Sequence, residues 1–261
     1  MPVFLPVLMF HTIDDRRSVI SFPPRVFRRA MGRLHDFGYR TLSLLEAWEH
    51  LRQGAKFPNR ALVITFDDGY ETVYKEAFPV LQYYGMSATV FLSVGNRKTN
   101  GGRLPSLEGR SMMSWSEIRE MRQEKIDFGA HTLTHPDLTQ LPTEQAESEI
   151  CESKKIIEDA LSAPVATFAY PFGRYDERCR EIVRQNFTLG CSDELGVIRR
   201  GSDRYALERV DASYLRRDRL FDVILTPVFP WYIWARGIPR RIRPDVPAPM
   251  VRYGSTELPA R

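Results

Sequence analysis

Short apolar runs alternate along this chain with segments whose apolar residues recur at helical spacing. The runs at residues 3–10, 61–66 and 87–92 predict buried strands, whereas 24–37 and 143–160 have the spacing of amphipathic helices. Further strands are expected at 40–42, 126–129, 165–169, 188–191 and 205–210, and further helices at 44–52, 71–84, 114–122 and 177–185. Strands that alternate with helices favour parallel pairing. The pattern therefore predicts an α/β fold.

The same pattern predicts one main domain followed by a different C-terminal segment. No linker or repeat divides residues 1–215, and a chain of 261 residues can bury one large core. Residues 216–243 are apolar and basic, and we expect them to form helices that pack on the domain or on a membrane surface. Residues 95–110 predict a long loop at a binding face, and 244–261 a loosely ordered tail.

Composition and charge narrow the possible partners and location. The net charge is +4, and arginines are concentrated in the last third of the chain. Residues 220–243 in this region could bind peripherally to a membrane surface without spanning the membrane. No basic segment with interleaved aromatic residues indicates a nucleic-acid partner. The three cysteines have no metal-ligand spacing, and neither a signal peptide nor an apolar run of about 18 residues is present. We therefore expect a cytoplasmic protein, with peripheral contact to the inner face of the membrane as an option.

Two short strings carry the candidate chemistry. T-F-D-D-G at residues 65–69 places Asp67 and Asp68 directly after a predicted strand, and H-T-L-T-H at 131–135 places His131 and His135 after another. A D-D-G string alone would equally suit the start of a helix. The carboxyl ends of parallel strands meet at one edge of a sheet, where α/β folds place their sites. Two histidines and one aspartate are ligands that zinc prefers, so the strings predict a metal site with one carboxylate left as a base.

His11 is a third element that reaches the same edge. It follows the apolar residues 7–10 and could be a further ligand, a proton donor or a histidine of the core. Beside a metal site, an imidazole is suited to proton transfer because its pKa is near neutrality.

The strings together resemble the first two motifs of the polysaccharide deacetylases, also called NodB-homology or carbohydrate esterase family 4 proteins. The sequence Y-P-F-G at Tyr170, Pro171, Phe172 and Gly173 is similar to the end of the family's third motif. The resemblance implies a distorted (β/α)7-type barrel over residues 1–215 that removes N-acetyl groups from amino sugars with a divalent metal, most often zinc. It also implies that Asp67 is the catalytic base and that Asp68, His131 and His135 are the metal ligands.

The chain departs from the family pattern at two places. The third motif of the family begins with an arginine that orients the base, but Ala169 stands at that position here, and Arg174 and Arg209 are candidates to replace it. The family's C-terminal motif supplies a catalytic histidine, yet no histidine follows His135. The string P-V-L-M-F-H at residues 6–11 resembles a permuted subgroup, the poly-N-acetylglucosamine deacetylases, which implies that His11 is the acid.

The expected activity is therefore metal-assisted amide hydrolysis of an N-acetylated glycan or amino sugar. Asp67 would take a proton from the attacking water, the backbone N–H of Phe172 would bind the oxyanion, and His11 would protonate the leaving amine. Alternatives are a deacylase or deformylase of a lipid- or nucleotide-linked sugar, a carbohydrate-binding relative without activity, and a metal phosphoesterase. A single metal beside one base suits acyl transfer better than the two-metal displacement of many phosphoesterases.

Overall fold

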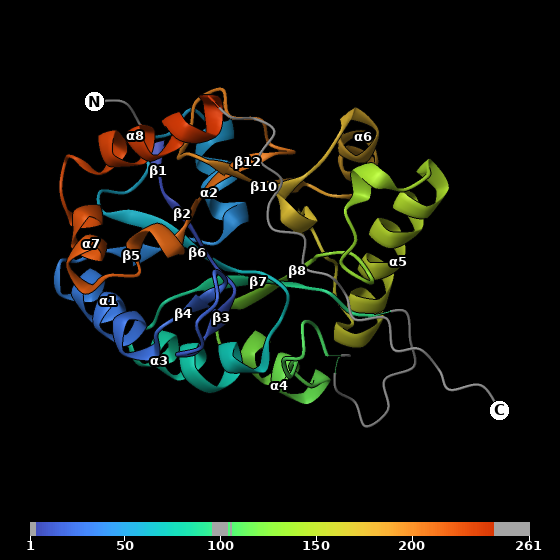
Figure 1. Ribbon diagram of the computed structural model, residues 1–261, viewed down its shortest axis with the longest axis horizontal. Coiled ribbons are helices and arrows are strands. Elements are labelled where there is room, and N and C mark those ends of the chain that lie inside the picture. The colour runs from blue at the N-terminus through green and yellow to red at the C-terminus, as the bar shows by residue number, and fades with distance from the viewer. Residues whose placement is uncertain (1–3, 96–103, 105, 243–261) are drawn as a thin grey trace.

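Seven parallel strands close into a barrel with helices on its outside (Figure 1). The computed structural model describes residues 4–95, 104 and 106–242. Around the ring the strands are β2 (Val7–Phe10), β12 (Leu207–Asp211), β10 (Leu189–Leu195), β9 (Thr167–Ala169), β8 (Ile126–Ala130), β7 (Ala88–Leu92) and β6 (Ala61–Phe66). Pairing of β2 with β6 closes the ring, and β5 (Arg40–Thr41) pairs with β6 on the outside. The predicted (β/α)7-type barrel is confirmed.

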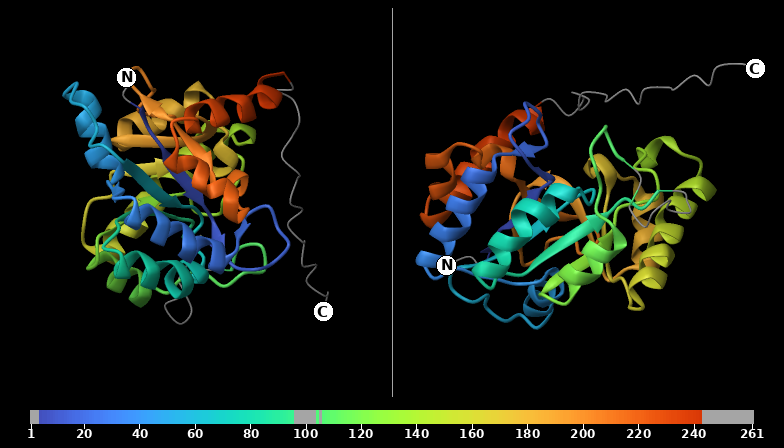
Figure 2. Two further views of the ribbon diagram at one scale, coloured as in Figure 1. Left: turned by 90° about the vertical axis from the view of Figure 1, so that its left-hand side faces the viewer. Right: turned by 90° about the horizontal axis from the view of Figure 1, so that it is seen from below.

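The apolar runs form strands because both of their faces are covered. Every residue of β2, β6 and β7 is buried, as expected for parallel strands between a barrel core and a layer of helices. Figure 2 shows the helices distributed around the barrel. They include α1 (Pro24–Asp36), α2 (Leu44–Arg52), α3 (Phe78–Tyr83), α4 (Trp115–Arg122), α5 (Thr143–Leu161) and α6 (Glu177–Asn186).

Two proline residues explain where predicted elements are broken. The predicted strand 3–10 is divided at Pro6 into β2 and β1 (Phe4–Leu5), and β1 pairs antiparallel with β11 (Ile198–Arg199) instead of joining the barrel. The predicted helix 71–84 begins as a π-helical turn, η1 (Val73–Ala77), before α3. Pro79 has no N–H to continue an α-helical ladder, and the N–H of Phe78 bonds the carbonyl of Val73, five residues back.

The C-terminal segment is helical as far as residue 242. It comprises η5 (Ala212–Leu215), α7 (Asp218–Phe221), η6 (Asp222–Leu225) and α8 (Phe229–Ile242). Phe229 and Ile233 of α8 are buried in the main core, whereas Trp231 and Trp234 are exposed. None of the described helices is both long and apolar enough to cross a membrane. Membrane contact by residues 220–243 stays a prediction, and most of the predicted loop 95–110 and all of the tail 244–261 lie outside the described residues.

Candidate metal centre

The predicted site residues follow three strands of the barrel at the same edge. Asp67 and Asp68 come directly after β6, His131 after β8 and His11 after β2. The backbone continues the strand pairing up to the site, because the N–H of Asp67 donates to the carbonyl of Phe10 at 2.9 Å. The N–H of His131 likewise donates to the carbonyl of Leu92, at the end of β7, at 2.9 Å. The fold therefore brings residues that are distant in the sequence to one edge of the barrel.

Asp68, His131 and His135 form a compact group of metal-ligand type. Oδ1 of Asp68 lies 3.3 Å from Nε2 of His131 and 3.2 Å from Nε2 of His135. One possible ligand atom from each residue lies within 4.8 Å of the other two, and all three side chains are buried. Oδ1 of Asp68 has no hydrogen-bond partner among the described residues. A buried carboxylate oxygen that faces two imidazole nitrogens without a hydrogen bond is suited to bind a cation.

The surrounding backbone determines which nitrogen of His131 faces the group. Nδ1 of His131 lies 2.7 Å from the carbonyl oxygen of Ala169, which can only accept a hydrogen bond. Nδ1 therefore carries the proton, and Nε2 keeps its lone pair for a metal. Although Ala169 lacks the arginine side chain of the family pattern, its carbonyl thus orients a candidate ligand.

Three residues of the site have left-handed backbone conformations. Asp68 has a φ of 73°, Thr132 of 67° and His135 of 59°, in a region that residues other than glycine rarely adopt. The histidine string therefore forms a compact turn and not a helix. In this turn the N–H of His135 donates to Oγ1 of Thr132 at 3.0 Å. Strained conformations of this kind persist where surrounding contacts enforce them, most often at functional sites.

Glu149 of α5 supplies such contacts, and no sequence motif indicated this role. Its Oε2 accepts hydrogen bonds from the N–H groups of Leu133 and Thr134, both at 2.9 Å, and its Oε1 accepts from Oγ1 of Thr134 at 2.7 Å. The carboxylate thus holds the turn between the two histidines from outside the metal group. The capping pattern and the apolar spacing of α5 could not show that this side chain faces the turn.

We expect Glu149→Ala to weaken metal binding by about 10- to 100-fold, because the turn that positions His131 and His135 loses its support. Glu149→Gln is the matched control, since its amide oxygen can still accept from the two N–H groups while its NH₂ donates to Thr134. The measurement is a competition titration of the metal against a chelator of known affinity. Equal metal affinities for the wild-type protein and Glu149→Ala would contradict this role.

Asp67 is held by an arginine of β12, which is separated from β6 in the barrel only by β2. Arg209 of β12 donates from Nη1 to Oδ1 of Asp67 at 2.7 Å and from Nη2 to Oδ2 at 2.8 Å. Its Nε donates to the carbonyl of Ser192 at 2.8 Å, and both charged side chains are buried. Burial by itself raises the pKa of Asp67, but the Arg209 guanidinium, with His131 and His11 nearby, holds this pKa below its usual value. Asp67 is therefore ionised at neutral pH and fixed in position.

Of the two arginines named as replacements at the position of Ala169, the structure brings only Arg209 to Asp67. Nη1 of Arg174 pairs instead with Oδ2 of Asp137 at 2.7 Å. The expectation that Arg174 could orient Asp67 is therefore corrected. Arg174 follows η4 (Pro171–Gly173), and its side chain extends to Asp137 in the turn before η3 (Leu138–Gln140) instead of to Asp67.

The Y-P-F-G string forms η4 at the end of β9, next to the metal group. The ring of Phe172 packs edge-on against the ring of His135 at a centroid distance of 4.7 Å. Phe172 has a φ of 57°, and its N–H donates to no acceptor among the described residues. Tyr170 is directed elsewhere, since its hydroxyl donates to the carbonyl of Tyr205 at 3.0 Å. Pro171 is buried, and a side chain on Gly173 would collide with Asp193. Phe172 thus offers a backbone donor beside His135.

His11 and Tyr70 complete the surroundings of the two carboxylates. His11 is half-buried, and it lies close enough to contribute to the lowered pKa values of Asp67 and Asp68. The Tyr70 hydroxyl is buried without a hydrogen-bond partner among the described residues, and burial together with nearby Asp68 raises its pKa. Tyr70 directly follows the T-F-D-D-G string, but only the structure shows that its hydroxyl is buried.

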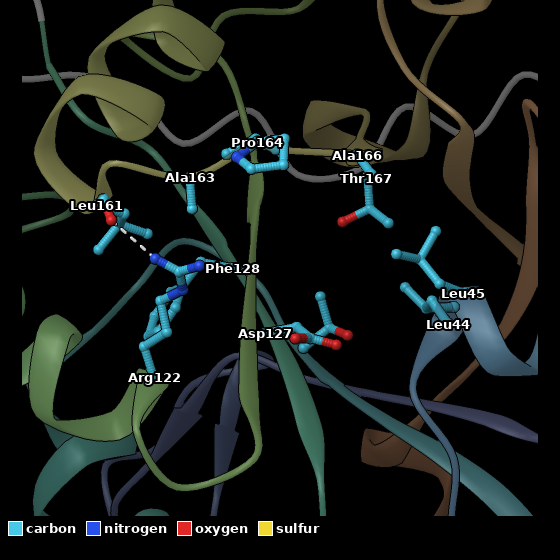
Figure 3. Close-up of a pocket in the computed structure, with 12 residues that line it drawn as sticks. Leu44, Leu45, Arg122, Asp127, Phe128, Leu161, Ala163, Pro164, Ala166 and Thr167 are labelled. Carbon is cyan, nitrogen blue, oxygen red and sulfur yellow. Dashed lines mark hydrogen bonds between the residues drawn. The ribbon is translucent and has the colours of Figure 1, made fainter.

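A separate small cavity lies near the opposite, amino-terminal ends of the strands (Figure 3). It has a volume of about 80 Å³ and is lined by Leu44, Thr89, Asp127, Thr167 and further residues of α2, β8 and the loop before β9. Arg122 closes one side and donates to the carbonyl of Leu161 at 2.8 Å. Asp127 is the single carboxylate among the described lining residues, so this cavity does not provide a second metal group.

Comparisons with known proteins agree with this geometry. Residues 54–187 match the model of the polysaccharide deacetylase family. The chain is 35% identical to YxkH of Bacillus subtilis, named as a polysaccharide deacetylase, over 213 residues that cover 81% of this chain and 72% of that protein. It is 26% identical to the poly-β-1,6-N-acetyl-D-glucosamine N-deacetylase of Staphylococcus aureus, over 67% of this chain and 61% of that protein.

A solved structure gives the same result. The fold superposes on the deacetylase PplD of Streptococcus pyogenes, solved in complex with acetate, with a TM-score of 0.72 and 27% identity. The superposition covers 81% of this chain and 93% of PplD. The family match, the identity to YxkH and the shared barrel lead to one conclusion: this chain belongs to the polysaccharide deacetylase family.

Proposed function

We propose that this protein is a metal-dependent hydrolase that removes N-acetyl groups from an N-acetylated amino sugar or glycan. The observation that carries the proposal is the pairing of two units at one edge of the barrel. One unit is the Asp68, His131 and His135 group, and the other is Asp67 held by Arg209. The first has the composition of a cation site with two histidines and one carboxylate, and the second is a buried, ionised base beside it.

The residues of the first unit fit a divalent metal, most simply zinc. Nε2 of His131 is left unprotonated by the contact of Nδ1 with Ala169, and Oδ1 of Asp68 has no hydrogen bond among the described residues. Burial opposes the ionised form of Asp68, yet the two histidines hold its pKa well below the usual value. When bound, a divalent ion would supply Lewis acidity that polarises the acetyl carbonyl and lowers the pKa of water.

The second unit fits the role of general base. Because Arg209 binds both oxygens of Asp67, the carboxylate is held in one orientation, with lone pairs left to accept a proton from water. The same ion pair keeps Asp67 ionised below neutral pH. In the family pattern, an arginine at the position of Ala169 orients the base. Arg209 is suited to perform this role here.

The remaining steps of amide hydrolysis have candidates on the adjacent strand ends. The N–H of Phe172 has no acceptor among the described residues, and the ring of the same residue packs against His135; we assign to this N–H the role of donor to the developing oxyanion. His11 follows β2 next to Asp67, where an imidazolium would protonate the leaving amine. Acetate and a free amino sugar are then released.

The substrate class is supported by relatives. Curated proteins of Staphylococcus aureus and Escherichia coli that match this chain are named poly-β-1,6-N-acetyl-D-glucosamine N-deacetylases. Their alignments cover 61% and 20% of those proteins, at 26% and 27% identity. An oligomer of N-acetylglucosamine is therefore a suitable first substrate for this chain.

The experiment measures acetate release from β-1,6-linked N-acetylglucosamine oligomers by zinc-loaded protein, with the free amine of the product quantified in parallel. Equal amounts of acetate and amine are expected. Release of formate from N-formyl sugars without acetate release would instead identify a deformylase. Bound zinc without turnover of any N-acyl sugar would identify a carbohydrate-binding relative and contradict the proposal.

A further inference from the structure

A groove lined by arginines lies between the C-terminal segment and the loop that joins β3 (Thr12–Ile13) to β4 (Ser21–Phe22). It has a volume of about 540 Å³, and we call it the arginine groove; its lining residues are Val19, Ser213, Tyr214, Arg216, Arg217, Leu220 and Arg236. Three of the seven residues carry a guanidinium group, and none of the seven is acidic. A hollow lined by three positive charges is suited to bind an anion.

Two of the three arginine side chains of the groove are positioned by contacts that are not ion pairs. Arg216 donates from Nη2 to the carbonyl of Val19 at 2.7 Å, and its Nε is buried without a hydrogen-bond partner among the described residues. The guanidinium of Arg236 stacks on the ring of Tyr214 at 4.9 Å and lies 5.7 Å from the ring of Tyr232. These contacts hold the guanidinium groups of Arg216 and Arg236 in place but provide no negative charge.

Another arginine-rich surface provides a contrast. On α1, Arg29 and Arg33 both bind the carboxylate of Asp222, at 3.1 and 3.4 Å. The described residues show no such ion pair for Arg216, Arg217 or Arg236. Within the part of the chain that the structure describes, the groove therefore differs from the surface of α1 because its guanidinium groups surround a hollow without forming ion pairs.

We propose that the arginine groove binds a phosphate or diphosphate group. Guanidinium groups match the oxygens of phosphate with parallel hydrogen bonds, and three of them exceed the charge that a single carboxylate can balance. The Nε of Arg216, which has no hydrogen-bond partner among the described residues, and the hydroxyl of Ser213 belong to further lining residues that can donate. The ligand class is thus a phosphorylated molecule.

The location of the groove connects it with the candidate metal centre. β2 leads through His11 and β3 to the loop that carries Val19, and β12 leads directly into η5, which carries Ser213 and Tyr214. β2 and β12 are parallel neighbours, with Met9 opposite Asp211, so both connections leave the barrel at the edge that holds Asp68. A phosphate in the groove would thus be carried by the sugar substrate, an assignment that rests on the proposed deacetylase function.

The test of the site itself does not depend on activity. Calorimetry with inorganic pyrophosphate compares the wild-type protein with Arg217→Gln/Arg236→Gln, which removes two exposed charges of the groove. The matched control is Arg199→Gln/Arg200→Gln, which removes two exposed charges near β11. We expect the groove variant to bind at least about tenfold more weakly and the control to bind like the wild type. Thermal unfolding of all three proteins verifies that they are folded, and equal affinities would overturn the proposal.

Two further measurements separate the sources of the phosphate. A substrate-borne phosphate predicts a lower KM for N-acetylglucosamine 1-phosphate than for N-acetylglucosamine, a difference that the groove variant loses without a change in kcat for the uncharged sugar. A lipid-borne phosphate predicts binding to phosphatidylcholine vesicles only when they contain phosphatidylglycerol, again lost in the groove variant. If neither sugar is hydrolysed, the proposed function fails, whereas the pyrophosphate titration still decides the groove. Weak binding of pyrophosphate to the wild type, with no vesicle binding, would overturn the groove site alone.

Discussion

Asp67→Asn is expected to lower kcat for acetate release by about 10²- to 10⁴-fold, the usual contribution of a general base. The amide has nearly the same shape as the carboxylate but cannot take a proton from water. Because Asp67 is not a member of the Asp68, His131 and His135 group, the variant should retain its zinc. The measurements are kcat for N-acetylglucosamine oligomers and zinc content by atomic absorption.

A matched control for this variant is Asp127→Asn, which alters a carboxyl near the opposite end of the barrel strands. It should keep both the activity and the zinc of the wild-type protein. Near wild-type turnover in Asp67→Asn would contradict the assignment of the base. Loss of zinc from Asp67→Asn would instead show that Asp67 takes part in metal binding.

Arg209→Met is expected to reduce the free energy of unfolding by about 3–5 kcal/mol, because it leaves the buried carboxylate of Asp67 without its partner. In the wild-type protein, folding lowers the pKa of Asp67. The ion pair therefore stabilises the folded state at pH values above the pKa of the unfolded carboxyl, and this stabilisation is lost as the pH falls through the lowered pKa of the folded state. Without Arg209, burial raises this pKa. The acid limb of the kcat profile should therefore move to higher pH.

The double variant Arg209→Met/Asp67→Asn separates the charge effect from lost packing. It contains no unpaired carboxylate and should recover much of the stability that Arg209→Met loses, although it remains inactive. Urea unfolding and the pH profile of kcat are the measurements. An unchanged acid limb in Arg209→Met would show that Arg209 has only a structural role and does not position or ionise the base.

The sequence predicted the barrel and the metal group because both depend on local patterns. The apolar run of β6 and the D-D-G string after it lie within nine residues, 61–69, and the histidine string follows β8 in the same manner. Parallel strands then require their carboxyl ends to meet. Pro6 and Pro79 altered the bounds of elements without altering this arrangement.

Contacts between distant side chains could not be predicted in this way. Arg209 contacts Asp67 although the two residues are 142 positions apart in the sequence. Arg174 was an equally good candidate to orient the base from the sequence alone, and only the fold distinguishes the two arginines. Glu149 and Tyr70 are similar cases, since neither belongs to a motif and each acts through the direction of its side chain. The arginine groove likewise combines the loop between β3 and β4 with η5 and α8.

We propose that hydrolysis depends on a metal held by the Asp68, His131 and His135 group. A titration of chelator-treated protein with zinc tests this dependence, with bound zinc and acetate release from N-acetylglucosamine oligomers measured together. Activity is expected to rise in proportion to bound zinc and to saturate at one ion per chain, and His135→Ala should neither bind zinc tightly nor recover activity. Full activity in zinc-free protein, or unchanged zinc binding in His135→Ala, would contradict it.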